Sequence, residues 1–301
     1  MNAGFPGAPP APRRRERWWL HGLLLLLTFA TTTYVGAGFA VNFRPGLLPA
    51  GGLAGGSLAP LVRGALSFSL PLLAILFAHE MGHYLMCRRY GIDASPPYFL
   101  PFPSLVGTLG AFIRIREPIA GKRQLFDIGV AGPIAGFVVA IPLLFWGIAH
   151  SRPNLSPVLE EGTILFRYPL AVTWAQTLTL GQTFTSEQAV EHPVFLAAWF
   201  GLFVTALNLL PIGQLDGGHA LYAVLGRHQR RAAWPILAAL ALLGLKWPGW
   251  WLWVVITLFI GVKHPPVLDE SEPLDAARLA VAVLVLLIFA VCFAPIPLVV
   301  T

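Results

Sequence analysis

Long apolar segments recur from one end of the 301-residue sequence to the other, and residues 18–41 and 126–149 are two of them. A helix needs about 20 consecutive apolar residues to cross a bilayer. Charged residues make up only 11% of the chain, whereas soluble domains contain roughly 25%. The predicted fold class is therefore an all-α polytopic membrane protein without a large soluble domain.

About seven transmembrane helices are expected. The segments are residues 18–41, 65–86, 126–149, a stretch that begins at Pro193, 232–245, 250–262 and 277–299. The fifth and sixth are short enough to form a re-entrant pair instead. If the spans alternate, the basic clusters all fall on one side and the acidic loop 150–192 falls on the other. Because basic flanks stay in the cytoplasm, the N-terminus is predicted to be cytoplasmic.

The net charge of +6 does not indicate nucleic-acid binding, because the basic residues flank apolar segments and form no patch with interleaved aromatics. Cysteine is almost absent. Cys87 and Cys292 both lie in or beside apolar segments, so neither a disulfide framework nor a cysteine metal site is available.

Residues 90–124 form a polar and irregular stretch that contains residues 107–116. In this stretch Ile113 and Ile115 alternate with Arg114 and Arg116. Alternation with a period of two predicts a short strand, and we expect it to be half of a β-hairpin at the membrane surface.

Residues 79–83 read His-Glu-Met-Gly-His inside the second apolar segment. This spacing puts His79 and His83 one helical turn apart on one face, where they can chelate Zn²⁺, with Glu80 close enough to act on a metal-bound water. Two histidines packed in a helix bundle, with a structural carboxylate at Glu80, are the alternative. Catalytic zinc usually takes three protein ligands, so the motif alone leaves the site incomplete.

Asp216 is the candidate for the third ligand. The segment 65–86 and the one that begins at Pro193 run in the same direction in the alternating topology. This puts Asp216 near the cytoplasmic end of its span, at the depth of the two histidines. A carboxylate there is costly unless a metal or a water-filled cavity compensates. His219, three residues further on, is either a further ligand or a residue that supports the site.

Taken with Asn-Leu-Leu-Pro at 208–211 and Leu-Asp-Gly at 215–217, the motif at 79–83 resembles the site-2 protease family of intramembrane zinc metalloproteases. The resemblance covers about residues 65–225 and includes the small-residue motif at 132–133. Each motif alone is moderately specific. The two in this order, in helices of membrane length, are far more specific.

The resemblance implies a three-helix catalytic core that binds one Zn²⁺ per chain. His79, His83 and Asp216 would be the ligands, and Glu80 the general base. Such proteases cut transmembrane or membrane-proximal segments of membrane-protein substrates, so the expected partners are such proteins and the lipid bilayer.

Two further elements are expected to bind the substrate. Asn208 matches the family's asparagine and would hold the substrate or its scissile carbonyl, although it could also cap or bond a neighbouring helix. The strand at 107–116 is similar to the family's membrane-associated edge strand. Gly110, Ala111 and Phe112 would then bind an unwound substrate by strand addition.

The chain departs from the family's pattern at Gly213, where a second proline is usual, and at Gln214, which precedes the leucine. The motif in this form is closer to the branch typified by chloroplast and cyanobacterial members. The loop 150–192 is too short to contain a PDZ domain.

The expected organisation has four parts. They are a disordered cytoplasmic tail at 1–17, the first transmembrane helix and connection at 18–64, a catalytic core at 65–225 and C-terminal transmembrane helices at 226–301. A bacterial inner membrane is the expected location, and the oligomeric state stays open. A metal or ion transporter is the first alternative function, disfavoured by the lack of inverted repeats. An inactive scaffold is the second, disfavoured by the intact ligand set and Glu80.

Overall fold

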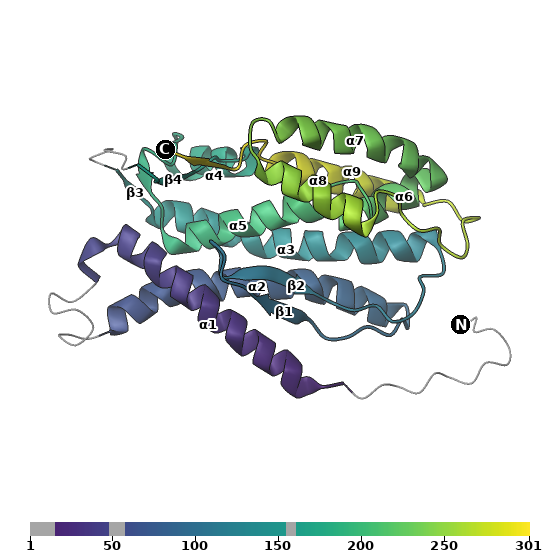
Figure 1. Cartoon of the computed structure of the whole chain (residues 1–301), viewed down its shortest axis with the longest axis horizontal. Helices are drawn as coiled ribbons and strands as arrows, with labels where there is room; N and C mark the ends of the chain where they lie inside the picture. Colours follow the sequence, from purple (N-terminus) through teal and green to yellow (C-terminus); the bar gives the residue numbers. More distant parts are fainter. Residues whose placement is uncertain (1–15, 48–57, 155–160) are drawn as a thin grey trace.

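The computed structural model of the chain describes residues 16–47, 58–154 and 161–301. The predicted tail lies outside the described residues except for Glu16 and Arg17, as does part of the predicted connection after the first helix. Among these residues, three helices are long and apolar enough to cross a membrane: α1 (Trp18–Phe43), α2 (Ala59–Arg89) and α3 (Lys122–His150). Helices α2 and α3 run along the long axis of the molecule, and α1 crosses α2 obliquely (Figure 1).

The remaining helices are shorter. They are α4 (Leu170–Leu180), α5 (Pro193–Asn208), α6 (Asp216–Leu225), α7 (Gln229–Leu243), α8 (Gly249–Ile260) and α9 (Ala276–Cys292). Among the described residues, α5, α8 and α9 are apolar helices of 10–17 residues. The mostly helical architecture is confirmed, whereas the number of seven spans stays a prediction.

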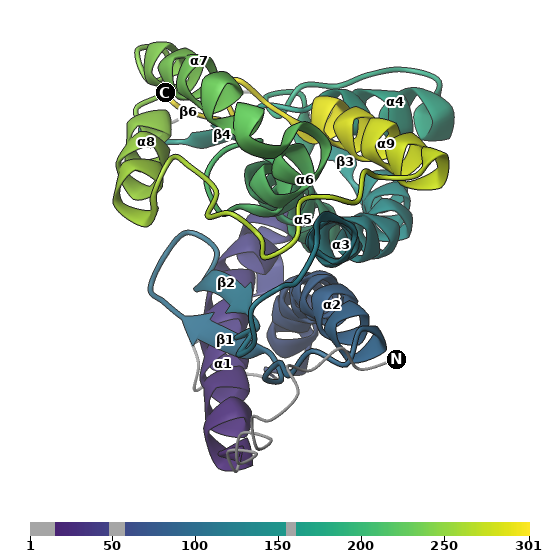
Figure 2. The same cartoon turned by 90° about the vertical axis from the view of Figure 1, so that its right-hand side faces the viewer.

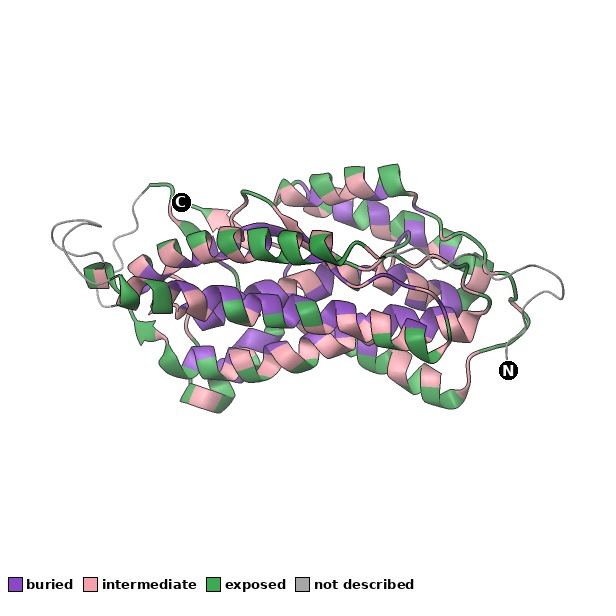
Figure 3. Cartoon of the chain, turned by 90° about the horizontal axis from the view of Figure 1, so that it is seen from below, coloured by how far each residue is buried: buried purple, intermediate pink, exposed green. Residues whose placement is uncertain are grey.

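The core forms where α3 lies between α2 on one side and α5 and α6 on the other (Figure 2). Burial is concentrated along these central helices (Figure 3), where Phe68, Phe126 and Trp199 are almost fully enclosed. Large apolar side chains are also exposed on the outside, and Phe259 is 93% exposed. Exposed apolar surface on this scale is the pattern of a protein whose outer helices face lipid.

The predicted hairpin is present as the antiparallel pair β1 (Tyr98–Pro101) and β2 (Thr108–Phe112). It packs on α1, where the Thr31 hydroxyl donates a hydrogen bond of 2.6 Å to the carbonyl of Gly107. Gly107 has φ +83° and sits so close to the backbone of Thr31 that a Cβ would lie 2.7 Å from its carbonyl oxygen. A turn at this position therefore requires glycine.

The segment 150–192 is not the plain loop that the sequence predicts, because it contains α4. Leu170–Leu180 follows Pro169 and ends at Gly181, which has φ +71° and closes the helix in the left-handed conformation. Two strand pairs were also not predicted. They are β3 (Arg152–Pro153) with β5 (Ala189–Val190), and β4 (Ile164–Phe166) with β6 (Leu298–Val300). Strands that pair over such distances along the chain have no turn between them, so no local sequence pattern predicts the pairing.

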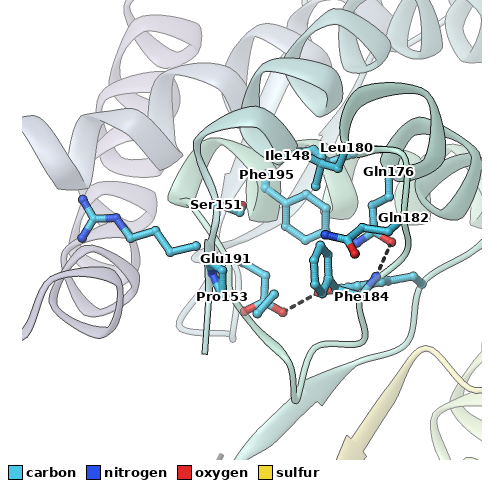
Figure 4. A pocket seen from close by; sticks show the side chains of 12 residues that line it. Ile148, Ser151, Pro153, Gln176, Leu180, Gln182, Phe184, Glu191 and Phe195 are labelled. Atoms are coloured by element: carbon cyan, nitrogen blue, oxygen red, sulfur yellow. Dashed lines mark hydrogen bonds between the residues drawn. The ribbon is translucent and has the colours of Figure 1, made fainter. Parts of the chain in front are cut away.

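A cavity of about 210 Å³ lies between the end of α3, α4 and the start of α5 (Figure 4). Ile148, which lines it, is 12 residues, or about 18 Å along α3, from Gly136, the α3 residue that packs against His79, so the cavity is separate from the His79–His83 motif. Its acid, Glu191, accepts a hydrogen bond of 2.8 Å from the Tyr168 hydroxyl and another from Ser186. Burial raises the pKa of Glu191 above its ordinary 4.5.

This raised pKa predicts a stability that depends on pH. The folded chain holds the proton of Glu191 more tightly than the unfolded chain, so stability is full below about pH 4.5 and declines as the pH rises. Glu191→Gln keeps a neutral group and is expected to flatten this decline, unfolding about 2–4 °C above the unmutated chain at pH 8. Thermal unfolding in detergent from pH 4.5 to 8 measures it. The exposed Glu161→Gln serves as the control, and parallel curves for the unmutated chain and Glu191→Gln would contradict the prediction.

Candidate metal centre

Three side chains from two helices converge inside the core. The Nε2 atoms of His79 and His83 lie 3.2 Å apart, and Asp216 Oδ2 lies 3.2 and 3.3 Å from them. Tetrahedral zinc with bonds of about 2.0–2.1 Å keeps its ligand atoms roughly 3.3 Å apart. The spacing of these donors and their chemistry, two imidazoles and a carboxylate, therefore fit Zn²⁺. Among the described residues, this is the one cluster of three or more such donors able to hold a metal ion.

The orientation of His83 is set by its other ring nitrogen. Nδ1 lies 2.7 Å from the carbonyl oxygen of Ile128 on α3, and a carbonyl can only accept. Nδ1 therefore holds the proton and donates it to Ile128, which leaves Nε2 with a free lone pair directed at the cluster. The imidazole is thus arranged to bind a metal through Nε2.

Glycines of α3 make room for both imidazoles. A Cβ on Gly132 would lie 2.1 Å from His83 Nε2, and one on Gly136 would lie 3.3 Å from His79 Cβ. At both glycines, the groups that pack against α3 are therefore the side chains of the proposed metal ligands.

The sequence predicts Asp216 near the end of the span that begins at Pro193, but the structure places it in a different helix. Helix α5 ends at Asn208, and Asp216 is the first residue of the separate helix α6. Gly217 packs against the end of α5 so tightly that a Cβ would lie 2.1 Å from the carbonyl oxygen of Leu209. The glycine after Asp216 therefore allows α6 to start beside the histidines.

Glu80 and the predicted substrate-binding residues lie around this cluster. Glu80 is buried, and the backbone of Ile113, one residue beyond β2, forms a hydrogen bond with its carboxylate. This brings the strand that contains Gly110, Ala111 and Phe112 to the edge of the site. The side-chain amide of Asn208 lies 3.3 Å from His79 Nε2, so it too faces the cluster.

His219 lies outside the cluster of three and has a partner that the sequence does not reveal. Its Nδ1 is 2.7 Å from Nε2 of His264, which stacks on Tyr222. His264 Nδ1 bonds to the Pro265 carbonyl and must donate, so neutral His264 accepts at Nε2 from His219. His264 is packed on α6 from a loop 45 residues after His219.

A buried pair of histidines and an aspartate, with a glutamate beside them and helices of membrane length around them, is the arrangement of a membrane-embedded zinc metalloprotease. The sequence matches Peptidase family M50 over residues 67–244. The chain belongs to this family, which confirms the resemblance to site-2 proteases.

Chloroplast proteins are among its relatives, in agreement with the predicted branch. The chain is 36% identical to "Probable zinc metalloprotease EGY1, chloroplastic" of Oryza sativa subsp. japonica over 56% of its length. It is 29% identical to "Probable zinc metalloprotease EGY2, chloroplastic" of Arabidopsis thaliana over 79% of its length. These matches span only 30% and 43% of the relatives' own lengths.

The contact between Gly132 and His83 predicts that one added methyl group at Gly132 weakens zinc binding. Gly132→Ala must displace the His83 ring, because its Cβ would lie 2.1 Å from Nε2. We expect zinc affinity to fall by about tenfold or more, since overpacking a tight contact costs about 1–3 kcal/mol. Chelator competition on the purified chain measures this. Gly22→Ala, where a Cβ meets open space, is the control. Unchanged zinc affinity in Gly132→Ala would show that the ring tolerates the methyl group.

Proposed function

We propose that the chain is an intramembrane zinc metalloendopeptidase that hydrolyses peptide bonds in or near transmembrane segments of membrane proteins. The observation that carries the proposal is the convergence of His79, His83 and Asp216, with Glu80 on the same helical turn as the histidines. We further propose one Zn²⁺ per chain, about seven spans with the N-terminus in the cytoplasm, and a bacterial inner membrane as the location.

A zinc ion held by these ligands would supply Lewis acidity and a water whose pKa is close to neutral. Glu80 would take the proton from the attacking water and pass it to the leaving amine. Its position supports this role, because Glu80 is buried on the same turn of α2 as the two histidines. The hydrogen bond from the Ile113 backbone keeps the carboxylate in place.

The substrate must be extended at the scissile bond, because the hydrogen bonds of a helix shield its peptide groups. Gly110, Ala111 and Phe112 lie in β2, one strand of a two-stranded sheet whose end reaches Glu80. Strand addition along β2 would hold an unwound segment beside the metal ligands. The amide of Asn208, next to His79, is suited to bonding the scissile carbonyl.

Glu80→Gln separates chemistry from metal binding. In detergent, the unmutated chain is expected to hold about one zinc ion and to cleave a reporter transmembrane segment. Glu80→Gln should keep the zinc and lose cleavage by at least about 10²–10⁴-fold, since it removes the proton acceptor. Glu117→Gln, an exposed acid, is the control.

Asp216→Ala should lose the metal, because two histidines alone bind zinc weakly. Full zinc retention in Asp216→Ala would remove Asp216 from the ligand set. Bound zinc without cleavage by the unmutated chain would favour a transporter or an inactive scaffold over the protease.

A further inference from the structure

Arg278 of α9 is bound to Asp127 of α3 through two hydrogen bonds. The guanidinium Nε donates to Oδ1 over 2.9 Å, and a terminal nitrogen donates to Oδ2 over 2.6 Å. The hydroxyl of Tyr90, at the end of α2, donates to the same carboxylate. Asp275, which caps α9, bonds the other side of the guanidinium. This clamp of four side chains joins α2, α3 and α9 at one point.

The clamp is next to the hydrogen bond that orients His83, because Asp127 is adjacent in sequence to Ile128. Asp127 immediately precedes Ile128, whose carbonyl oxygen receives the Nδ1 proton of His83 over 2.7 Å. A movement of the helical turn that contains Asp127 therefore moves the group that orients His83. Outer partners of metal-binding histidines typically change metal affinity by about 10–100-fold when they are lost.

The ion pair with Arg278 keeps the Asp127 carboxylate in its place. The Asp127 carboxylate is only 17% exposed, and among the described residues its one ion-pair partner is Arg278. Without that cation the carboxylate would be drawn toward water and would pull its helical turn with it. A planar guanidinium holds the two carboxylate oxygens in a fixed orientation, which a single point charge cannot do.

We propose that Arg278 is a positioning residue for the metal centre: by holding Asp127 it fixes the turn of α3 that presents the Ile128 carbonyl, and through it the ring of His83. The inference rests on the proposed function, since it requires a bound zinc ion. Arg278 lies beyond residues 67–244, which match Peptidase family M50. The C-terminal helix of this chain thus contributes to a site whose ligands lie within the matched segment.

The first test compares Arg278→Met with a matched control in the full chain. Arg278→Met should raise the zinc dissociation constant about tenfold, by chelator competition. It should also shift the visible absorption of the Co²⁺-loaded protein, which reports ligand geometry. In the control, Arg123→Met removes an ion pair of 3.2 Å between α3 and Glu272 whose side chains are 40% and 64% exposed. The zinc dissociation constant and the Co²⁺ absorption of Arg123→Met should both match those of the unmutated chain.

Two milder variants keep the test decisive if Arg278→Met does not fold. Arg278→Lys keeps the charge without the two-point contact, and Tyr90→Phe removes one donor to Asp127. Both should weaken zinc binding less than tenfold and lower kcat more than they change KM. Trp199→Phe loses a hydrogen bond to the Arg167 carbonyl and serves as a variant that is destabilised elsewhere. It should unfold at lower temperature with zinc affinity intact.

The outcomes separate the two proposals. If the unmutated chain binds zinc and cleaves, but the Arg278 and Tyr90 variants match it in zinc affinity and Co²⁺ spectrum, Arg278 does not position the metal centre. The same conclusion follows if Trp199→Phe weakens zinc binding as much as they do. If the unmutated chain binds no zinc, the proposed function itself fails, and the positioning role fails with it.

Discussion

The close approach of α2 and α3 is the contact on which the site depends. A Cβ on Gly82 would lie 2.4 Å from the carbonyl oxygen of Ala131, so the two backbones touch where a side chain would keep them apart. That proximity places the Ile128 carbonyl against His83 and lets the ring fit over Gly132. The orientation of a metal-binding side chain is therefore fixed by helix packing and not by a loop.

The second requirement is a carboxylate at the same place, and the compact turn between α5 and α6 supplies it. Residues from both ends of this turn lie close to His79 Nε2. They are the Asn208 amide, at 3.3 Å, and Asp216 Oδ2, at 3.2 Å. A metal ion held by the two imidazoles would compensate for the charge of Asp216 inside an apolar protein. The proposed ligand and the proposed substrate-binding amide thus come from one short segment.

The sequence predicts that His79, His83 and Asp216 lie close together, and the structure brings them together. His79 and His83 need only the period of a helix, and Asp216 follows from the direction of two apolar segments. The separate helix α6 is not predictable in the same way, because it depends on how Gly217 packs against Leu209. The His219–His264 bond and the Arg278–Asp127 clamp join residues 45 and 151 positions apart, and no periodicity links such pairs.

The departure at Gly213 and Gln214 has a physical reason in this fold. Gly213 has φ +58°, which proline cannot adopt, and its N–H donates to the carbonyl of Val262 over 3.2 Å, a bond that proline lacks. The Gln214 amide bonds to the carbonyl of Ile260, the last residue of α8. The turn before Asp216 is therefore held by the end of α8. Together with the Arg278 clamp, these bonds connect the C-terminal region to α3 and to the turn before Asp216.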